Sequence, residues 1–201
     1  MTGEPVPDQN LWDAWEPAEL ARRLGGLPLP WCVVGGWALD LWHGAATREH
    51  EDLEFTVLRD DLGPFRQALG DMALFTAHGG VVAPLAAGEE LAPDIAQIWC
   101  FDRAAGRWRA DMMIEPGTSD VWAYKRAPAV TRPRPEMVAL SADGIPYLNP
   151  AAVLLFKAKH LRPKDEADFA GALPKLPAAE RRWLRERLVQ LHPGHDWIAA
   201  L

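Results

Sequence analysis

Features of membrane-bound, exported and nucleic-acid-coating proteins are missing from this sequence. No apolar run approaches the roughly 20 residues that a membrane-spanning helix needs. The N-terminal stretch MTGEPVPDQNLWDAWEP has neither the basic start nor the apolar centre of a signal peptide, so we expect a cytoplasmic protein. The net charge of −7 argues against a broad basic surface that coats nucleic acid.

Cysteine is scarce as well. The only two, Cys32 and Cys100, lie in apolar, strand-like stretches, and we interpret them as buried thiols, not as a disulfide or a metal pair. The remaining composition is that of a globular protein, with 49% hydrophobic residues, 24% charged residues and ten tryptophans in 201 residues. This length predicts one domain, or one domain with a small appendage.

One group of basic residues departs from the acidic trend. In YKRAPAVTRPRPE, the side chains of Lys125, Arg126, Arg132 and Arg134 are interleaved with prolines, which is typical of an exposed loop. A solvated loop is the simpler interpretation, and a local basic patch is the alternative. The overall charge favours a small-molecule substrate.

The hydrophobic pattern predicts an α/β (α+β) fold. Strands are expected in WCVVGG and around LEFTV, and hairpins in IAQIWCFD–RWRADMMIE and in MVALSADGIPYL. Helices are expected in EPAELARRLGG, WALDLWHG, RDDLGPFRQALGDM, AAVLLFKAKH, KDEADFAGAL and PAAERRWLRERLVQL.

The stretch GGWALDLWHGAATREHEDLEF gathers carboxylates that repel one another. Apolar residues alternate with Asp52, Glu54 and Thr56 along the strand, so these three share the opposite face. The same alternation in RWRADMMIE puts Asp111 on a polar face, beside the first two acids if the strands are neighbours. Asp102 and Glu115 on the same hairpin are alternatives for this third acid.

Clustered carboxylates need a cation between them. Mg²⁺ binds through few carboxylates and keeps places for water and substrate phosphates. Two such ions about 3.5–4 Å apart can clamp the attacking and leaving oxygens of a displacement at phosphorus. Gly35 and Gly36 before the helix would let phosphate approach backbone N–H groups and the helix dipole, although a tight turn alone also explains them.

These residues resemble the polymerase-β-type nucleotidyltransferase superfamily, and most closely its aminoglycoside nucleotidyltransferase branch. In that branch a Gly-Gly-Trp-Ala helix leads into a Thr-Arg-x-His-x-Asp strand. The matching residues here are Gly35, Gly36, Trp37, Ala38, Thr47, Arg48, His50 and Asp52. A looser resemblance lies in LLFKAKHLRPKDEADF, which is similar to segments of small nucleotidyltransferases, including toxin components of toxin–antitoxin pairs.

The resemblance implies a nucleotidyltransferase fold with a mixed, twisted sheet flanked by helices. We expect a core over residues 1–140 and a mainly helical portion over 141–201, which can belong to the same domain. The resemblance also implies that Asp52 and Glu54 bind two Mg²⁺ ions and that Asp111 completes the triad as ligand or base.

Phosphate contacts are implied for a second group of residues. Gly35 and Gly36 would hold the triphosphate, and Lys157 or Lys159 would contact phosphate. Arg48 could also steady phosphate. The simpler alternatives are an ion pair with Glu49 or Glu51 for the arginine and a solvated helix face for the lysines.

Three further residues receive structural interpretations. We expect His50 to form a hydrogen bond at the strand entrance, since no second His or Cys stands at metal-ligand spacing. Asp165 and Asp168 fall in the first turn of a helix, where the dipole favours acids.

The implied reaction is transfer of AMP from ATP to a hydroxyl of a small, aminoglycoside-like molecule. A toxin-type transferase that acts on tRNA or protein is the alternative within the enzymes. A nucleotidyltransferase-like binding module without activity is the third hypothesis. Glu54 favours that module, because the family usually has Asp there and one methylene displaces the carboxylate.

Overall fold

The computed structural model describes residues 5–201, and its frame is one mixed sheet. Eight strands follow the order β4-β3-β5-β6-β2-β1-β10-β9, and β7 pairs with β8 separately. The strands are β1 (Trp31–Val33), β2 (Glu54–Leu58), β3 (Ala73–His78), β4 (Val81–Pro84), β5 (Gln97–Asp102), β6 (Arg107–Glu115), β7 (Val121–Ala123), β8 (Thr131–Pro133), β9 (Val138–Leu140) and β10 (Pro146–Leu148). The predicted mixed α/β fold is confirmed.

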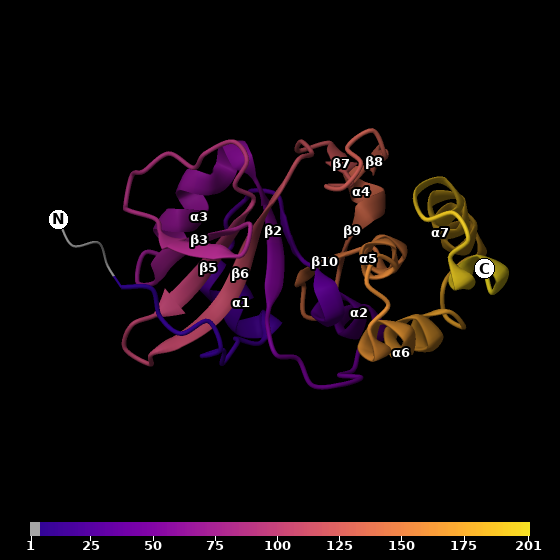
Figure 1. Ribbon diagram of the computed structural model, residues 1–201, viewed down its shortest axis with the longest axis horizontal. Helices are drawn as coiled ribbons and strands as arrows, with labels where there is room; N and C mark the ends of the chain where they lie inside the picture. The colour runs from indigo at the N-terminus through magenta and orange to yellow at the C-terminus, as the bar shows by residue number, and fades with distance from the viewer. Residues whose placement is uncertain (1–4) are drawn as a thin grey trace.

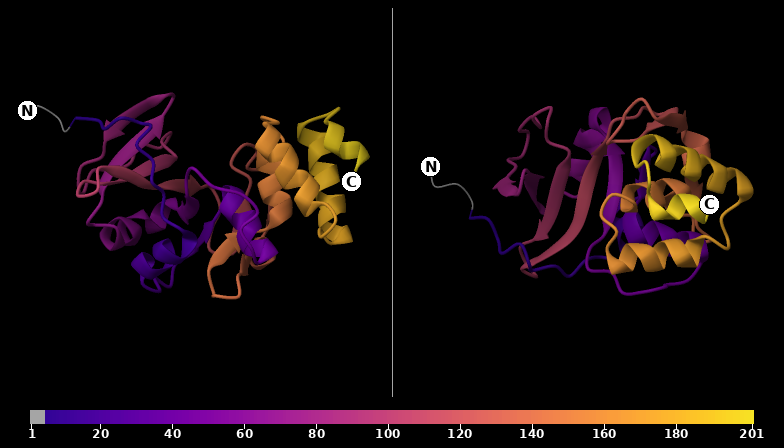
Figure 2. Two further views of the ribbon diagram at one scale, coloured as in Figure 1. Left: turned by 90° about the horizontal axis from the view of Figure 1, so that it is seen from below. Right: turned by 45° about the vertical axis from the view of Figure 1, so that its right-hand side comes forward.

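Seven α-helices accompany the strands in residues 5–201. They are α1 (Pro17–Leu24), α2 (Gly35–His43), α3 (Leu62–Ala68), α4 (Arg134–Met137), α5 (Pro150–Lys157), α6 (Pro163–Ala172) and α7 (Ala178–Leu191), with 3₁₀ turns η1 (Arg59–Asp61) and η2 (Asp196–Ala199). Figure 1 shows α5, α6 and α7 together at one end of the molecule, away from α3 and β3, and Figure 2 shows the same separation from two other sides. None of the described helices is both long and apolar enough to span a membrane.

Sequence signals account for the ends of the helices. Pro17 occupies the first turn of α1, and Gly25 ends that helix with a left-handed φ of 60°. The Asn149 side chain accepts a hydrogen bond from the N–H of Ala151, at 2.9 Å, and so caps α5. These three boundaries agree with the sequence prediction.

Both predicted hairpins are present, and they build the sheet from its two sides. Strands β5 and β6 pair antiparallel, as do β9 and β10. The predicted apolar face of β6 is buried, with Trp108, Ala110 and Met112 at 0% exposure. Cys32 and Cys100 are free, buried thiols, as expected.

The division of the chain at residue 140 stays a prediction. Strand β10 pairs with β1 in parallel, with Val33 opposite Tyr147, so residues after 140 complete the main sheet. The three long C-terminal helices follow that strand, and α5 packs against α2. This packing fixes the helical portion beside the carboxylate-bearing strand.

The prediction of a solvated Pro-rich loop over residues 124–136 is wrong in its second half. Arg132 lies in β8, and its guanidinium is held by Glu136 and Glu180. Arg134 begins α4, is buried, and donates two hydrogen bonds to the Glu115 carboxylate. These arginines are structural because glutamates far along the chain neutralise them.

Candidate active site

The centre of the sheet brings two of the predicted acids together. Strand β2 runs parallel to β6, and in their register Glu54 stands directly opposite Asp111. Both side chains point to the same face because paired residues of adjacent strands share a face. Asp52 lies two residues before Glu54, just outside the strand, and is exposed. The predicted adjacency of the two strands is confirmed.

Asp111 is buried and only partly satisfied. Its Oδ2 accepts a hydrogen bond from the Gln97 side chain at 2.5 Å, whereas its Oδ1 has no hydrogen-bond partner among residues 5–201. Burial, and next the negative charge of Glu54, raise the pKa of Asp111 to about 8. The pKa of Glu54 is also raised, by burial and by the charge of Asp52.

The two alternative acids on the same hairpin, Asp102 and Glu115, form ion pairs with other residues. Asp102 pairs with Arg109 and accepts backbone hydrogen bonds in its own turn. Glu115 is buried in an ion pair with Arg134. Asp111 is therefore the carboxylate of β6 that faces Glu54.

The two glycines at the start of α2 are required by different neighbours. Gly35 has a φ of +66°, and a Cβ on it would collide with Oε2 of Glu54. A Cβ on Gly36 would instead collide with the side chains of Arg48 and His50. Gly35 thus allows the Glu54 carboxylate to lie against the beginning of the helix, and Gly36 allows the preceding loop to pack on it.

Asp40 explains the Thr-Arg-x-His part of the motif. This buried carboxylate on α2 accepts hydrogen bonds from the N–H and hydroxyl of Thr47 and lies 2.6 Å from Nε2 of His50. The His50 ring stacks on Trp37 with centroids 4.3 Å apart. The predicted hydrogen-bonding role of His50 is confirmed, and the loop before Asp52 is fixed to α2.

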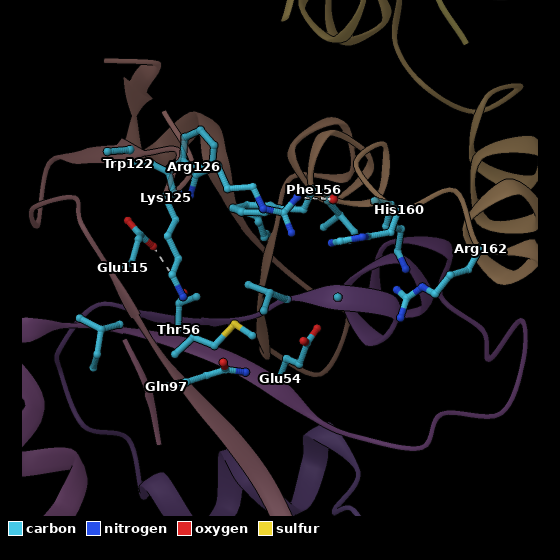
Figure 3. Close-up of a pocket in the computed structure, with 18 residues that line it drawn as sticks. Glu54, Thr56, Gln97, Glu115, Trp122, Lys125, Arg126, Phe156, His160 and Arg162 are labelled. Atoms are coloured by element: carbon cyan, nitrogen blue, oxygen red, sulfur yellow. Dashed lines mark hydrogen bonds between the residues drawn. The ribbon is translucent and has the colours of Figure 1, made fainter. Parts of the chain in front are cut away.

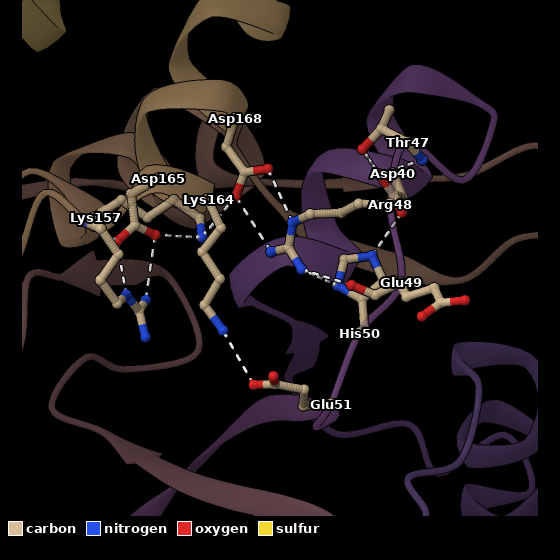
Figure 4. A network of polar contacts seen from close by, with 11 residues as sticks. Asp40, Thr47, Arg48, Glu49, His50, Glu51, Lys157, Lys164, Asp165 and Asp168 are labelled. Carbon is tan, nitrogen blue, oxygen red and sulfur yellow. Dashed lines mark hydrogen bonds and ion pairs between the residues drawn. The ribbon is translucent and has the colours of Figure 1, made fainter.

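Arg48 and Lys157 meet in a buried ion network (Figure 4). Asp168 accepts hydrogen bonds from the Arg48 guanidinium at 3.1 and 3.2 Å and lies 2.8 Å from Nζ of Lys157. Asp165 lies 3.1 Å from the same Nζ and also binds Arg162. The alternative of an ion pair between Arg48 and Glu49 or Glu51 is wrong in its partner, because Arg48 pairs with Asp168.

Asp165 lies in the first turn of α6, as predicted, whereas Asp168 lies beyond that turn, and both aspartates are buried in the network. Their side chains are 0% and 5% exposed. Burial raises their pKa values, but hydrogen bonds from Arg162 and Lys157 outweigh it at Asp165 and lower its pKa to about 2. At Asp168, Arg48 and Lys157 likewise lower the pKa below its ordinary value. These acids lock α5 and α6 onto the loop before β2.

We expect Asp168→Asn to destabilise the protein by about 3 kcal/mol, because it leaves Arg48 without its carboxylate and Lys157 with Asp165 alone. Lys164→Gln is the matched control, since it breaks an exposed pair with Glu51 and should cost about 0.5 kcal/mol or less. Urea unfolding of both variants measures the difference. Equal losses would show that the network does not hold the helices in place.

A pocket of about 340 Å³ opens over Glu54 and Gly35 (Figure 3). Lys157 and Arg162 come to it from the helical side, whereas Arg48 and Gly36 are not among its lining residues. Lys125 reaches into it from the loop after β7, above Thr56 in Figure 3. Lys125 is exposed and lies in a loop, as the sequence interpretation expected, and it also lines the pocket, which the sequence pattern did not indicate.

Lys125 is the pocket cation whose charge acts on Asp111, whereas Lys157 and Arg162 act on Glu54. Its Nζ donates a long hydrogen bond of 3.4 Å to the backbone oxygen of Ala96. Burial lowers its pKa, while the charges of Asp111 and Glu54 act in the opposite direction. Within residues 5–201, no three His, Cys, Asp or Glu side chains form a ready-made metal cluster.

Comparisons with known proteins agree with this geometry. A family model described as aminoglycoside-2''-adenylyltransferase matches residues 18–78, which run from α1 to β3. No curated protein sequence matches the chain. Three solved structures are similar at low identity, and their sequences align over most of their own length.

The antibiotic-resistance factor ANT(2'')-Ia in solution has a TM-score of 0.57 at 15% identity, over 86% of this chain and 89% of that chain. The crystal structure of ANT(2'')-Ia with adenylyl-2''-tobramycin has a TM-score of 0.54 at 15% identity. The match covers 86% of this chain and 94% of that chain. The lincosamide antibiotic adenylyltransferase LnuA, bound to lincomycin, has a TM-score of 0.53 at 17% identity. The match covers 77% of this chain and 92% of that chain.

The fold is therefore that of the nucleotidyltransferases, with the two facing carboxylates on its central parallel strands. The resemblance of the chain to the aminoglycoside nucleotidyltransferase branch is confirmed by the family model and by the similar structures.

Proposed function

We propose that this protein is an Mg²⁺-dependent nucleotidyltransferase that transfers AMP from ATP to a hydroxyl of a small, aminoglycoside-like molecule. The observation that supports it most directly is the pairing of Glu54 with Asp111 beside the Gly35 turn, where Glu54 lines a pocket together with four cations. The similar structures are those of adenylyltransferases for antibiotics, which agrees with this proposal.

The carboxylates suit a divalent cation. One buried oxygen of Asp111 lacks a partner in the described part of the chain, and the raised pKa values of Asp111 and Glu54 reflect burial and mutual repulsion that a cation would relieve. Asp52, Glu54 and Asp111 would hold the ions. When bound, Mg²⁺ supplies positive charge that stabilises the charge developing on the phosphate oxygens.

The residues of the chain then have distinct tasks in the transfer. The acceptor oxygen forms a bond to the α-phosphorus, the bond from that phosphorus to the β-phosphate oxygen breaks, and pyrophosphate leaves. Asp111 takes the hydroxyl proton, while Gln97 holds its other oxygen. The N-terminus of α2 at Gly35 offers N–H groups to the triphosphate.

The cations in and beside the pocket divide into two groups in this proposal, and Arg48 lies beside the pocket, not in its lining. Lys157 is held by two aspartates and Arg48 by one, so both act on the phosphates by positioning the helices and the loop. Gly36 has the same indirect effect through Arg48 and His50. Lys125 faces the acids and contacts the phosphates directly.

We expect Mg²⁺ and ATP together, at about ten times the dissociation constant, to stabilise the protein by about 1.4 kcal/mol and raise its melting temperature by about 4 °C. Lys125→Met should weaken nucleotide binding about tenfold, because a charge-assisted contact is lost. Lys175→Met, a change outside the pocket, is the control. Thermal shift titrations measure both, and no shift at millimolar MgATP would refute the assignment of the site.

A further inference from the structure

The pocket lining is rich in positive charge, which limits the kinds of acceptor molecule that it can bind. Four Lys or Arg side chains line it against two glutamates, Glu54 and Glu115. Glu115 is neutralised by Arg134 and also accepts a hydrogen bond from Thr56. Glu54 faces Asp111 and is assigned to metal binding in the proposed reaction. The lining therefore offers no spare carboxylate to an ammonium group.

Two cations on the wall formed by the loop after β7 carry charge that no ion pair in the described part of the chain compensates. Arg126 donates a hydrogen bond to the backbone oxygen of Phe156 at 2.6 Å, and its guanidinium lies 5.2 Å from the centre of that ring. Lys125 contacts only the backbone oxygen of Ala96 at 3.4 Å. Neither side chain forms a salt bridge within residues 5–201.

The rest of the wall is apolar. Met113 and Ile114 come from β6, Trp122 comes from β7, and Val153 and Phe156 come from α5. Figure 3 shows Trp122 and Phe156 on the same side of the pocket as the two uncompensated cations. Such a surface binds an anion and an apolar face, and it repels a molecule with several ammonium groups. Lys125 and Arg126 are exposed, so this repulsion acts over about 10 Å at 0.1 M salt and further at low salt.

We propose that the acceptor is a hydroxyl compound with an apolar face and at most one positive charge, and that polycationic aminoglycosides are poor substrates. This inference rests on the proposed function. The acceptor then resembles an aminoglycoside in its hydroxyl groups and not in its charge. The triphosphate uses Lys125, and the acceptor meets Arg126 and the apolar wall.

The test compares tobramycin with tobramycin acetylated on all of its amino groups, which has the same hydroxyls without ammonium charge. Each is titrated by calorimetry into the full chain saturated with Mg²⁺ and a non-hydrolysable ATP analogue. We expect the acetylated compound to bind at least about tenfold more tightly at low salt, and the difference to shrink as NaCl screens the repulsion. Equal or tighter binding of tobramycin, or no binding of either compound, would overturn the proposal.

Two variants with the same change of net charge locate the effect. Arg126→Glu should reduce the affinity ratio of acetylated tobramycin to tobramycin about tenfold. Arg107→Glu, outside the pocket, should leave this ratio unchanged. The same shift in both variants would contradict an effect of the pocket. If Arg126→Glu does not fold, the salt dependence of the affinity ratio in the natural protein tests the proposal instead. Failure of the ATP analogue itself to bind would overturn the proposed function together with this inference, whereas bound analogue with preferred tobramycin overturns the inference alone.

Discussion

Glu54→Gln is expected to reduce nucleotidyl transfer about a thousandfold and to abolish metal-dependent nucleotide binding. The Glu54 carboxylate lies against Gly35 and opposite Asp111, so the neutral amide removes charge from the centre of the site without changing its shape. Losses of this size are typical when a group that stabilises charge in the transition state is removed. Transfer of label from ATP and Mn²⁺ titration measure the two effects.

Glu54→Asp distinguishes an active catalytic site from one that has lost its activity. The strand and the Gly35 turn are built around the longer side chain, so the aspartate should retain some activity, about tenfold to a hundredfold below the natural residue. If the protein is a binding module without chemistry, neither substitution will matter. Unchanged Mn²⁺ affinity in Glu54→Gln would favour that module.

Asp111→Asn is expected to lower transfer by about 10²- to 10⁴-fold, because the proton acceptor is lost. The asparagine oxygen can still accept the hydrogen bond from Gln97, so the fold should survive. A variant that retained full activity would exclude Asp111 as the base. Single-turnover kinetics at saturating nucleotide separates this loss from weakened binding.

The same substitution should change the pH dependence of stability in the metal-free protein. The pKa of Asp111 is about 8 in the folded chain against an ordinary value of 3.8, so the folded state holds this proton more tightly than the unfolded state. The free energy of unfolding therefore falls as the pH rises from about 4 to about 8, by at most about 1.4 kcal/mol per pH unit from this group. Asp111→Asn should remove that slope and be the more stable protein above pH 8. Urea unfolding in EDTA from pH 5 to pH 9 measures it, and equal slopes in both proteins would refute the assigned cause.

Local patterns predicted much of the site because they depend on neighbours in the sequence. Alternation of side chains predicted the shared face of Glu54 and Thr56, which both line the pocket, and the polar parity of Asp111 in its hairpin. The place of Asp52 on that face stays a prediction, because β2 begins only at Glu54. Helix caps such as Asn149 and Pro17 act within one turn and were equally readable.

Partners that are distant along the chain could not be predicted in this way. The Arg48–Asp168 pair joins residues 120 positions apart, and the sequence offered nearer acids with the same charge. Lys125 and Arg134 belong to one Pro-rich segment, yet the first lines the pocket and the second is buried against Glu115. Periodicity cannot distinguish them, because the difference depends on which strand lies beside the segment.

The sequence alone determined the chemical inventory of this protein: carboxylates on one strand face, a glycine pair before a helix, and a resemblance to the nucleotidyltransferases. The tertiary structure decided how the inventory is used. Parallel pairing of β2 with β6 sets Glu54 opposite Asp111. The burial that follows raises the pKa of both carboxyls, while long-range ion pairs decide which cations remain to meet a ligand. Strand order and burial depend on contacts among distant residues, and those contacts form only when the whole chain packs.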